Sequence, residues 1–294
     1  MIRSKASKIF GAVNIVILSL LALSCLLPFI HIIAISFSSN AVVSSGAVTF
    51  WPKQITLYAY KYLLSKDLFW RSFMNSVVRV ILGAGLNLLM IVVLAYPLSK
   101  EKKDFRWRNI YVWFFFFTSL FNGGLIPNYM LLNQLKMLNT IWALVLPCAV
   151  HVFNMILMLN FYRQLPHEME EAAFIDGAGQ WRTLLNIYIP CSLPSIATLA
   201  LFSVVNHWNA WFDGLIYMND ASNYPLQSYL QTVIIGLDIT SGNFDPNDFE
   251  RIKELSSRTI TAAQIIIATL PVLLIYPFLQ KYFVTGIVLG SVKG

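Results

Sequence analysis

The stretch that decides the fold is RQLPHEMEEAAFIDGAGQWRTLLNIYIP, residues 163–190, which lies between two long apolar segments. Pro166 suits a first helical position, and the glutamates of HEMEE complement the N-terminal end of a helix dipole. Gly177 predicts the end of this helix, and Trp181 suits a membrane interface. The sequence therefore predicts a short helix within residues 166–179 that projects from a membrane and turns back into it.

Small residues on this helix suggest contact with another surface. Met169, Ala172, Ala173 and Asp176 follow one another at three- to four-residue spacing, which predicts one shared face. Two alanines on a face let a neighbouring surface approach closely. The helix is therefore interpreted either as an amphipathic linker or as an element that docks into a groove of a cytoplasmic partner.

The composition of the whole chain is that of a membrane protein. Of its 294 residues, 57% are hydrophobic and 12% are charged, and the mean hydropathy is +0.64. Soluble chains carry roughly 45–50% apolar and about 25% charged residues. So little charge cannot cover a water-facing surface of this size, which excludes the soluble globular classes.

Gaps between consecutive charged residues mark the membrane spans. A spanning helix needs about 20 mostly apolar residues, and a charge at mid-bilayer costs at least about 2.5–3.5 kcal/mol. Six gaps qualify. The third contains Gly123, Gly124 and Pro127, which predict a bent or re-entrant segment, and the fifth contains Pro190 and Pro194. The six predicted transmembrane helices cover residues 9–37, 73–99, 107–123, 140–162, 184–217 and 259–281.

Basic residues predict the orientation of these spans. They gather before the first span, at Arg3, Lys5 and Lys8, and between the second and third, in Lys100–Arg108. Cytoplasmic segments carry this excess, so both termini are expected in the cytoplasm. Topology then explains the net charge of +7 without a nucleic-acid partner.

The sequence contains no catalytic constellation. It lacks a GxxxxGK[ST] phosphate loop, and HEMEE lacks the second histidine of a HExxH zinc motif. Its three cysteines form no closely spaced pair. We therefore expect no catalytic residues, no metal site and no cofactor in this chain.

The stretch 163–190 also resembles a known family. Residues 171–173 read EAA, Gly177 follows four positions after the second alanine, and residues 187–190 read IYIP. This arrangement resembles the EAA motif of ABC-importer permeases, with Ile189 in place of the usual leucine. Further matches, similar to the carbohydrate branch of MalG and LplC/YtcP type, are IDGAG, FWP, WN and the tail QKYF to GSVKG at residues 175–179, 50–52, 208–209 and 280–294.

The resemblance implies an all-α, six-span permease of the type I importer fold, one domain over residues 1–294, in a bacterial cytoplasmic membrane. It implies four partners: a second, non-identical permease, a dimer of ABC ATPase subunits that binds ATP and Mg²⁺, an extracytoplasmic solute-binding protein, and a sugar cargo. The chain itself would be a translocation subunit without enzymatic activity. Other cargoes (peptides, amino acids or polyamines) and a non-transport sensor or scaffold are the alternatives.

The resemblance also implies two contacts with the ATPase. The helix of residues 166–179 would dock in a cleft of the ATPase and transmit its motion to span five, and the tail would add a second contact. Simple complementarity to the helix dipole is the other explanation for Glu171. The coupling candidates are Glu168, Glu171, Ala172, Ala173, Asp176 and Gly177, and the tail candidates are Gly290, Lys293 and Gly294.

Span five offers a mixture of aromatic and hydrogen-bonding residues that suits sugars. The candidates for the substrate pathway are Asn206, Trp208, Asn209, Trp211 and Asp213. An aromatic belt at the membrane interface is the alternative for the two tryptophans. An acid near a membrane edge needs a wet or paired environment, and Arg79 is a possible partner for Asp213. The long segment 219–257 is expected outside, as a docking surface for the binding protein or as disordered chain.

Overall fold

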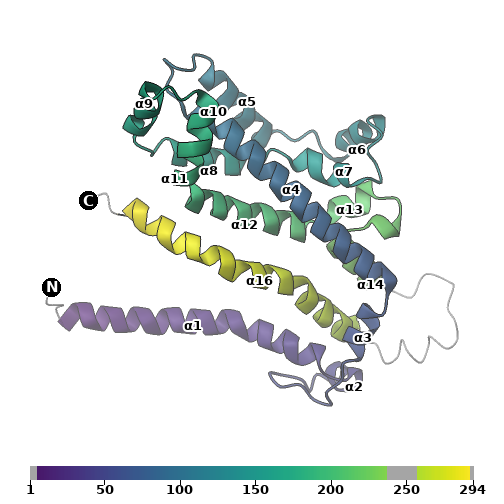
Figure 1. Ribbon diagram of the computed structural model, residues 1–294. Coiled ribbons are helices and arrows are strands. Elements are labelled where there is room, and N and C mark those ends of the chain that lie inside the picture. Colours follow the sequence, from purple (N-terminus) through teal and green to yellow (C-terminus); the bar gives the residue numbers. More distant parts are fainter. Residues whose placement is uncertain (1–4, 237–256, 292–294) are drawn as a thin grey trace. The chain divides into compact units, whose positions relative to one another are not determined.

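The computed structural model describes residues 5–236 and 257–291, and this part of the chain is helical, with a single isolated antiparallel bridge between Ser38 and Ile55. The predicted all-α class is therefore confirmed (Figure 1). The described helices are α1 (Lys5–Ser36), α2 (Asn40–Ser44), α3 (Tyr58–Leu64), α4 (Asp67–Ser99), α5 (Arg108–Leu120), α6 (Leu125–Gln134), α7 (Ile141–Val145), η1 (Leu146–Cys148), α8 (Val152–Tyr162), α9 (His167–Ile175), α10 (Gln180–Thr183), η2 (Leu184–Tyr188), α11 (Ile189–Cys191), α12 (Leu193–Asn209), α13 (Phe212–Tyr217), η3 (Ala221–Asn223), α14 (Leu226–Gly236) and α16 (Ser257–Ser291).

Contacts divide the chain into two units, Met1–Asp67 with Thr232–Leu270, and Leu68–Gln231 with Pro271–Gly294. In the first unit, α3 packs against the start of α16, where Leu63 and Ile260 are fully buried. The helix α1 contributes little to this core, because the side chains along most of its length are exposed.

The second unit has its core where α4, α8, η2 and α12 meet. Ile91, Met158, Leu184 and Leu199 are each at most 2% exposed, and each comes from a different one of these helices. Figure 1 shows α4 as a long helix beside the short ones that follow α5. The functional candidates of the second unit are therefore placed around one straight helix.

Three helical segments in the described residues are long and apolar enough to cross a membrane: Ile9–Ser36, Asp67–Ser99 and Arg258–Ile275. Three further pairs of shorter helices pass the same test if each pair forms one bent span, which brings the number to at most six. These segments overlap the six predicted windows, although the bent pair of the third span extends to Gln134, beyond the predicted end at residue 123. The expectation that span three bends is met at Gly124 (φ +90°), where α5 and α6 form an angle of 112°.

Span four was expected over 140–162 without a break, and span five over 184–217 with Pro190 and Pro194 as helix-disturbing residues; the structure shows a break in each. Span four breaks between η1 and α8 with a bend of 45°, and span five bends by 82° at Ser192 and ends at Asn209 before α13 begins. Pro147 lies in η1, just before the break in span four, and Pro194 lies in the first turn of α12, just after the bend in span five; a missing N–H is tolerated at the start of a helix.

Asn87 of α4 explains how the break in span four is stabilised. Its Nδ2 donates to the carbonyl oxygens of Cys148 and Ala149 at 3.2 and 3.1 Å, and its Oδ1 accepts from the Ser203 hydroxyl at 2.6 Å. Carbonyl groups released by a helix break are costly in an apolar environment unless they find partners. The side-chain amide of Asn87, which is 2% exposed, therefore supplies hydrogen bonds to the carbonyl groups at the break and links the break to α12.

The first part of the predicted segment 219–257 is ordered by side-chain amides. Asn75 of α4 donates to the carbonyl oxygens of Ser222 and Tyr224 at 2.9 and 3.2 Å, and the Oδ1 of Asn139 accepts from the backbone N–H of Asn219 at 3.2 Å. The segment continues as α14, and residues 237–256 lie outside the described part of the chain.

Candidate functional site

The short helix predicted between the fourth and fifth spans is α9, His167–Ile175. Gly177 ends it with φ +77°, and its N–H donates to the Phe174 carbonyl at 3.0 Å while the N–H of Ala178 donates to the Ala173 carbonyl at 2.9 Å. This pair of bonds is a Schellman motif, which favours glycine because a Cβ is strained at positive φ. The predicted end of the helix at Gly177 is confirmed.

The two faces of α9 differ from the predicted pattern. Ala173 is 7% exposed and Glu170 is also 7% exposed, three residues earlier on the same side, so this face packs inside the chain. Glu168, Glu171 and Ala172 are exposed. The expected single face with two alanines is therefore wrong, because α9 uses Ala173 for its own packing and leaves Ala172 outward.

Glu170 forms a buried ion pair with Lys100, the residue after the last turn of α4. Lys100 Nζ contacts Glu170 Oε1, and the two side chains are 7% and 10% exposed, respectively. Burial lowers the pKa of the Lys100 ammonium, and the hydrogen bond to Glu170 opposes that shift. The pair therefore joins α9 to α4 through a contact shielded from water.

Tyrosine rings surround this ion pair. Lys100 Nζ lies 3.9 Å from the ring centroid of Tyr96 and 4.6 Å from that of Tyr188, and the Tyr188 hydroxyl donates to Glu170 Oε2 at 2.7 Å. The Tyr96 hydroxyl donates to Gln180 Oε1 at 2.7 Å, at the start of α10. Cation–π contacts and hydrogen bonds of this kind offset the desolvation of a buried charge pair. We call Tyr96, Lys100, Glu170 and Tyr188 the latch.

The latch connects three separate helices, of which α4 is distant in sequence from the other two. Tyr96 and Lys100 belong to the end of α4, Glu170 to α9, and Tyr188 to the π-helix η2. Arg108 reinforces this end of α4, since its Nη1 donates to the Lys100 carbonyl at 2.6 Å. The latch therefore joins α9 both to the end of α4 and to the segment that leads into span five.

Lys100 and Glu170 were not predicted as a pair, because the glutamates of HEMEE were interpreted only as complements to the helix dipole. A better signal was available. Glu170 precedes Ala173 by three residues, so an inward alanine predicts an inward glutamate, and a buried glutamate requires a cation. Lys100, directly after an apolar span, was a candidate for that cation.

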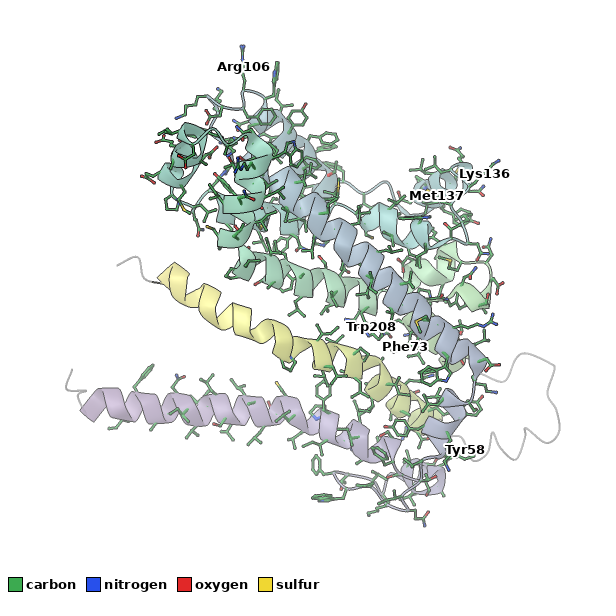
Figure 2. All side chains as sticks on the ribbon, in the orientation of Figure 1. Tyr58, Phe73, Arg106, Lys136, Met137 and Trp208 are labelled. Atoms are coloured by element: carbon green, nitrogen blue, oxygen red, sulfur yellow. The ribbon has the colours of Figure 1, made fainter. Side chains whose placement is uncertain are left out.

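The predicted pathway residues lie around the break after α12. Asn206, Asn209, Trp211 and Asp213 line an open hollow of about 380 Å³. Trp208 is placed elsewhere, because it is 5% exposed and its ring packs edge-on against Phe73 with centroids 5.9 Å apart (Figure 2). The structure therefore brings four of the five candidates together.

Arg79 and Asp213, suggested as partners from the sequence, form an ion pair in the structure. Arg79 Nη1 donates to Asp213 Oδ1 at 3.1 Å and to the Ala210 carbonyl at 3.2 Å, and its Nη2 contacts Asp213 Oδ2. The arginine side chain is 1% exposed and the aspartate 23%. The guanidinium therefore lies behind the hollow, neutralises the carboxylate at its wall, and satisfies a carbonyl released where α12 ends.

Of the three tail candidates, one lies in the described part of the chain. Gly290 lies in α16, which ends at Ser291, and Lys293 and Gly294 lie outside the described residues. In the described part of the chain, no group of three or more His, Cys, Asp or Glu side chains is arranged to hold a metal ion.

The long apolar helices, the bent helix pairs and the buried polar links define an integral-membrane protein of helical type. The family described as "binding-protein-dependent transport system inner membrane component" matches residues 73–288. Protein LplC of Bacillus subtilis (strain 168) is 41% identical over 291 residues, which cover 99% of this chain and 97% of LplC. The polygalacturonan/rhamnogalacturonan transport system permease protein YtcP of the same organism is 38% identical over 278 residues, 94% of this chain and 96% of YtcP.

A solved structure supports the same family. A chain in the crystal structure of a bacterial ABC transporter involved in the import of the acidic polysaccharide alginate is 33% identical, with a TM-score of 0.83, and the match covers 96% of this chain and 99% of that one. This chain belongs to the binding-protein-dependent transport system inner membrane component family and has the type I ABC-importer permease fold. The resemblance drawn from the EAA motif is thereby confirmed.

The latch predicts strong energetic coupling between Lys100 and Glu170. We expect Lys100→Met and Glu170→Gln each to lower the free energy of unfolding by about 3–5 kcal/mol, because each leaves a buried polar partner without its counterpart. The double variant is expected to lose less than the sum of the two. The measurement is the unfolding midpoint of the purified chain in detergent micelles titrated with dodecyl sulfate.

A suitable control is Lys103→Met, which removes the exposed pair that Lys103 Nζ forms with Glu101 Oε2 at 3.1 Å. Its midpoint is expected to stay near that of the wild type, since exposed pairs contribute little. Additive effects of the two latch substitutions would contradict the interpretation of the latch as one unit.

Proposed function

We propose that this chain is the translocation subunit of a binding-protein-dependent ABC importer for oligosaccharides. The observation that carries the proposal is α9, whose inner face is fixed by Glu170 and Ala173 while Glu171 and Ala172 remain exposed. A helix held rigidly on one side and free on the other suits a docking element for a motor. Two relatives that transport polysaccharides, YtcP and the alginate transporter, support a polysaccharide-derived cargo.

The proposed topology is one permease domain that crosses the bacterial cytoplasmic membrane six times with both termini inside. The three long helices and three bent pairs supply the six spans. The basic residues in Lys100–Arg108 favour the cytoplasm for the α4–α5 connection. The latch and α9 then lie on the cytoplasmic side, and the hollow beside Asp213 lies toward the outer side.

In the proposed complex, this chain binds no nucleotide. Two ABC ATPase subunits hold ATP and Mg²⁺ and supply the energy of hydrolysis. A second, non-identical permease completes the pore, and an extracytoplasmic solute-binding protein delivers the sugar, with the segment 219–257 as its docking surface. A bacterial alginate ABC transporter has been solved in complex with an alginate pentasaccharide-bound periplasmic protein, and this assembly of a similar protein supports the proposed arrangement.

Coupling follows from the connections of α9. The exposed residues Glu168, Glu171, Ala172 and Asp176 would contact a cleft of the ATPase, and Gly177 would allow the turn back into the membrane. Closure of the ATPase dimer would rotate α9, and the latch would carry the rotation to α4 and η2. Gly290, Lys293 and Gly294 would form the second contact. Alternating access of the pore then follows from movement of the spans around the cargo site.

The hollow beside Asp213 is the proposed part of the cargo pathway in this chain. Trp211 is 41% exposed and offers an aromatic face to a sugar ring, while Asn206 and Asn209 offer amide groups to hydroxyls. Because Arg79 neutralises Asp213, the hollow does not repel a carboxylated sugar. Acidic oligosaccharides are therefore compatible with this site.

The coupling proposal predicts the effect of bulk on the exposed face of α9. Ala172→Phe is expected to abolish co-purification of the ATPase with the tagged chain in mild detergent, because Ala172 is exposed and its small side chain permits close approach. The chain itself is expected to keep its unfolding midpoint. Co-eluting proteins are identified by mass spectrometry.

The matched control is Ala221→Phe, on an exposed alanine of η3. It is expected to retain the ATPase, because η3 lies on the opposite side of the proposed membrane. If the wild-type chain elutes without any ATPase, the importer proposal is wrong and a sensor or scaffold is the better explanation.

The cargo proposal predicts a role for Trp211 in transport. Trp211→Ala is expected to lower the import of a labelled oligogalacturonide by about fivefold to tenfold in proteoliposomes with the complete complex, which corresponds to about 1–1.4 kcal/mol of lost binding. The control is Trp113→Ala on α5, which is 67% exposed and distant in sequence. Equal import by both variants and the wild type would show that Trp211 serves the membrane interface only.

A further inference from the structure

The loop between α2 and α3 turns back along the end of α1. The Thr49 carbonyl lies 2.6 Å from His31 Nδ1, five residues before the last residue of α1. Farther along the loop, the N–H of Lys53 donates to Ser38 Oγ at 3.0 Å, and the N–H of Thr56 donates to the Phe37 carbonyl at 2.9 Å. The loop, drawn next to α2 in Figure 1, therefore runs back along α1 to the level of His31 and then returns to the level of Ser38.

Apolar packing fixes the descending part of this loop. Val48 is 6% exposed and packs with Ala34 of α1 and Val43 of α2, which are 1% and 4% exposed. The residues that follow face away from this cluster: Phe50 is 47% exposed and Trp51 is 79% exposed. The loop therefore buries a valine and leaves two adjacent aromatic rings free to contact another apolar surface.

Helix geometry gives the depth of these side chains. The apolar part of α1, Ile9–Ser36, has 28 residues, which span about 42 Å at 1.5 Å per residue. The hydrocarbon core is about 30 Å thick, so a centred α1 leaves roughly 6 Å of helix in the interfacial layer at each end. His31 then lies near the boundary between hydrocarbon and headgroups, and Phe50 and Trp51, between the levels of His31 and Ser38, lie in the interfacial layer.

We propose that residues 48–52 form an interfacial anchor, in which Phe50 and Trp51 insert into the lipid surface around the C-terminal end of α1. Amphipathic aromatic rings favour this layer of the bilayer. Lys53 is exposed directly after Pro52 and is placed to meet lipid phosphates. Because His31 and Val48 tie the loop to the helix, the anchor fixes the depth of α1.

Lipid is the proposed contact for these rings because the loop follows a helix that is itself exposed within this chain. The 18-residue window that identifies α1 as a span has none of its residues buried within this chain. Near the level of His31, where the loop turns, Phe29, Ile30 and Ile33 of α1 are 47%, 43% and 44% exposed. This inference depends on α1 crossing a membrane and stands whatever the cargo is.

The test measures the depth of single spin labels in the complete transporter in lipid nanodiscs. In a background with Cys25, Cys148 and Cys191 replaced by alanine, nitroxide labels are attached after Trp51→Cys, after Phe50→Cys and, as the control in the same loop, after Lys53→Cys. Collision rates are recorded with oxygen, which concentrates in hydrocarbon, and with a nickel chelate, which stays in water.

The expected result is an oxygen-to-nickel collision ratio severalfold higher at positions 50 and 51 than at position 53. Free access of the nickel chelate at all three positions would place the loop in water and overturn the proposal. Poor access of both reagents at positions 50 and 51 would mean that a protein subunit covers the rings, and would also overturn it. The Phe50 label keeps the test valid if Trp51→Cys lowers the yield.

Discussion

The buried ion pair of Lys100 and Glu170 is the interaction on which the position of α9 in this permease depends. Two charges taken out of water destabilise a fold unless they meet each other and further partners, and here two tyrosine rings and a hydroxyl complete the set. The pair has one arrangement that satisfies it, which fixes where α9 sits against α4. Because α9 has only nine residues, it could not hold that position by helix propensity alone.

The need of buried polar groups for partners also shapes the apolar, bent helices of the second unit. Spans three, four and five are broken, and every break releases backbone groups that lipid cannot satisfy. Asn87 serves the break before α8, and Arg79 serves the end of α12, each from the straight helix α4. The polar residues of α4 therefore act as fixed partners for irregular backbone, and Arg79 at the same time sets the charge of the hollow beside Asp213. The contacts of Arg79 therefore serve both the end of α12 and the proposed cargo site.

Much of the fold was predictable because membrane spans are defined by a strong one-dimensional signal. Charge-free windows located the apolar segments, and Gly177 and Gly124 predicted a helix end and a bend that require positive φ. The break in span four was not predicted, because the charge-free window 140–162 was interpreted without Pro147, although a proline inside a helix removes a backbone hydrogen bond. The inward Glu170 was missed because complementarity to the helix dipole treats the glutamates of HEMEE alike and ignores a partner on another helix. Trp208, chosen for its residue type, is packed against Phe73, a contact that depends on the rotation of α12.

The most direct test of coupling through the latch compares ATP hydrolysis with transport in the reconstituted complex when the ion pair is replaced by uncharged residues, Lys100→Met with Glu170→Gln. We expect that the ATPase still assembles and hydrolyses ATP while the amount of sugar imported per ATP falls sharply, because α9 can move without displacing α4 and η2. An unchanged ratio of sugar to ATP would contradict this mechanism, since motion would then reach the pore by a route that does not pass through the latch.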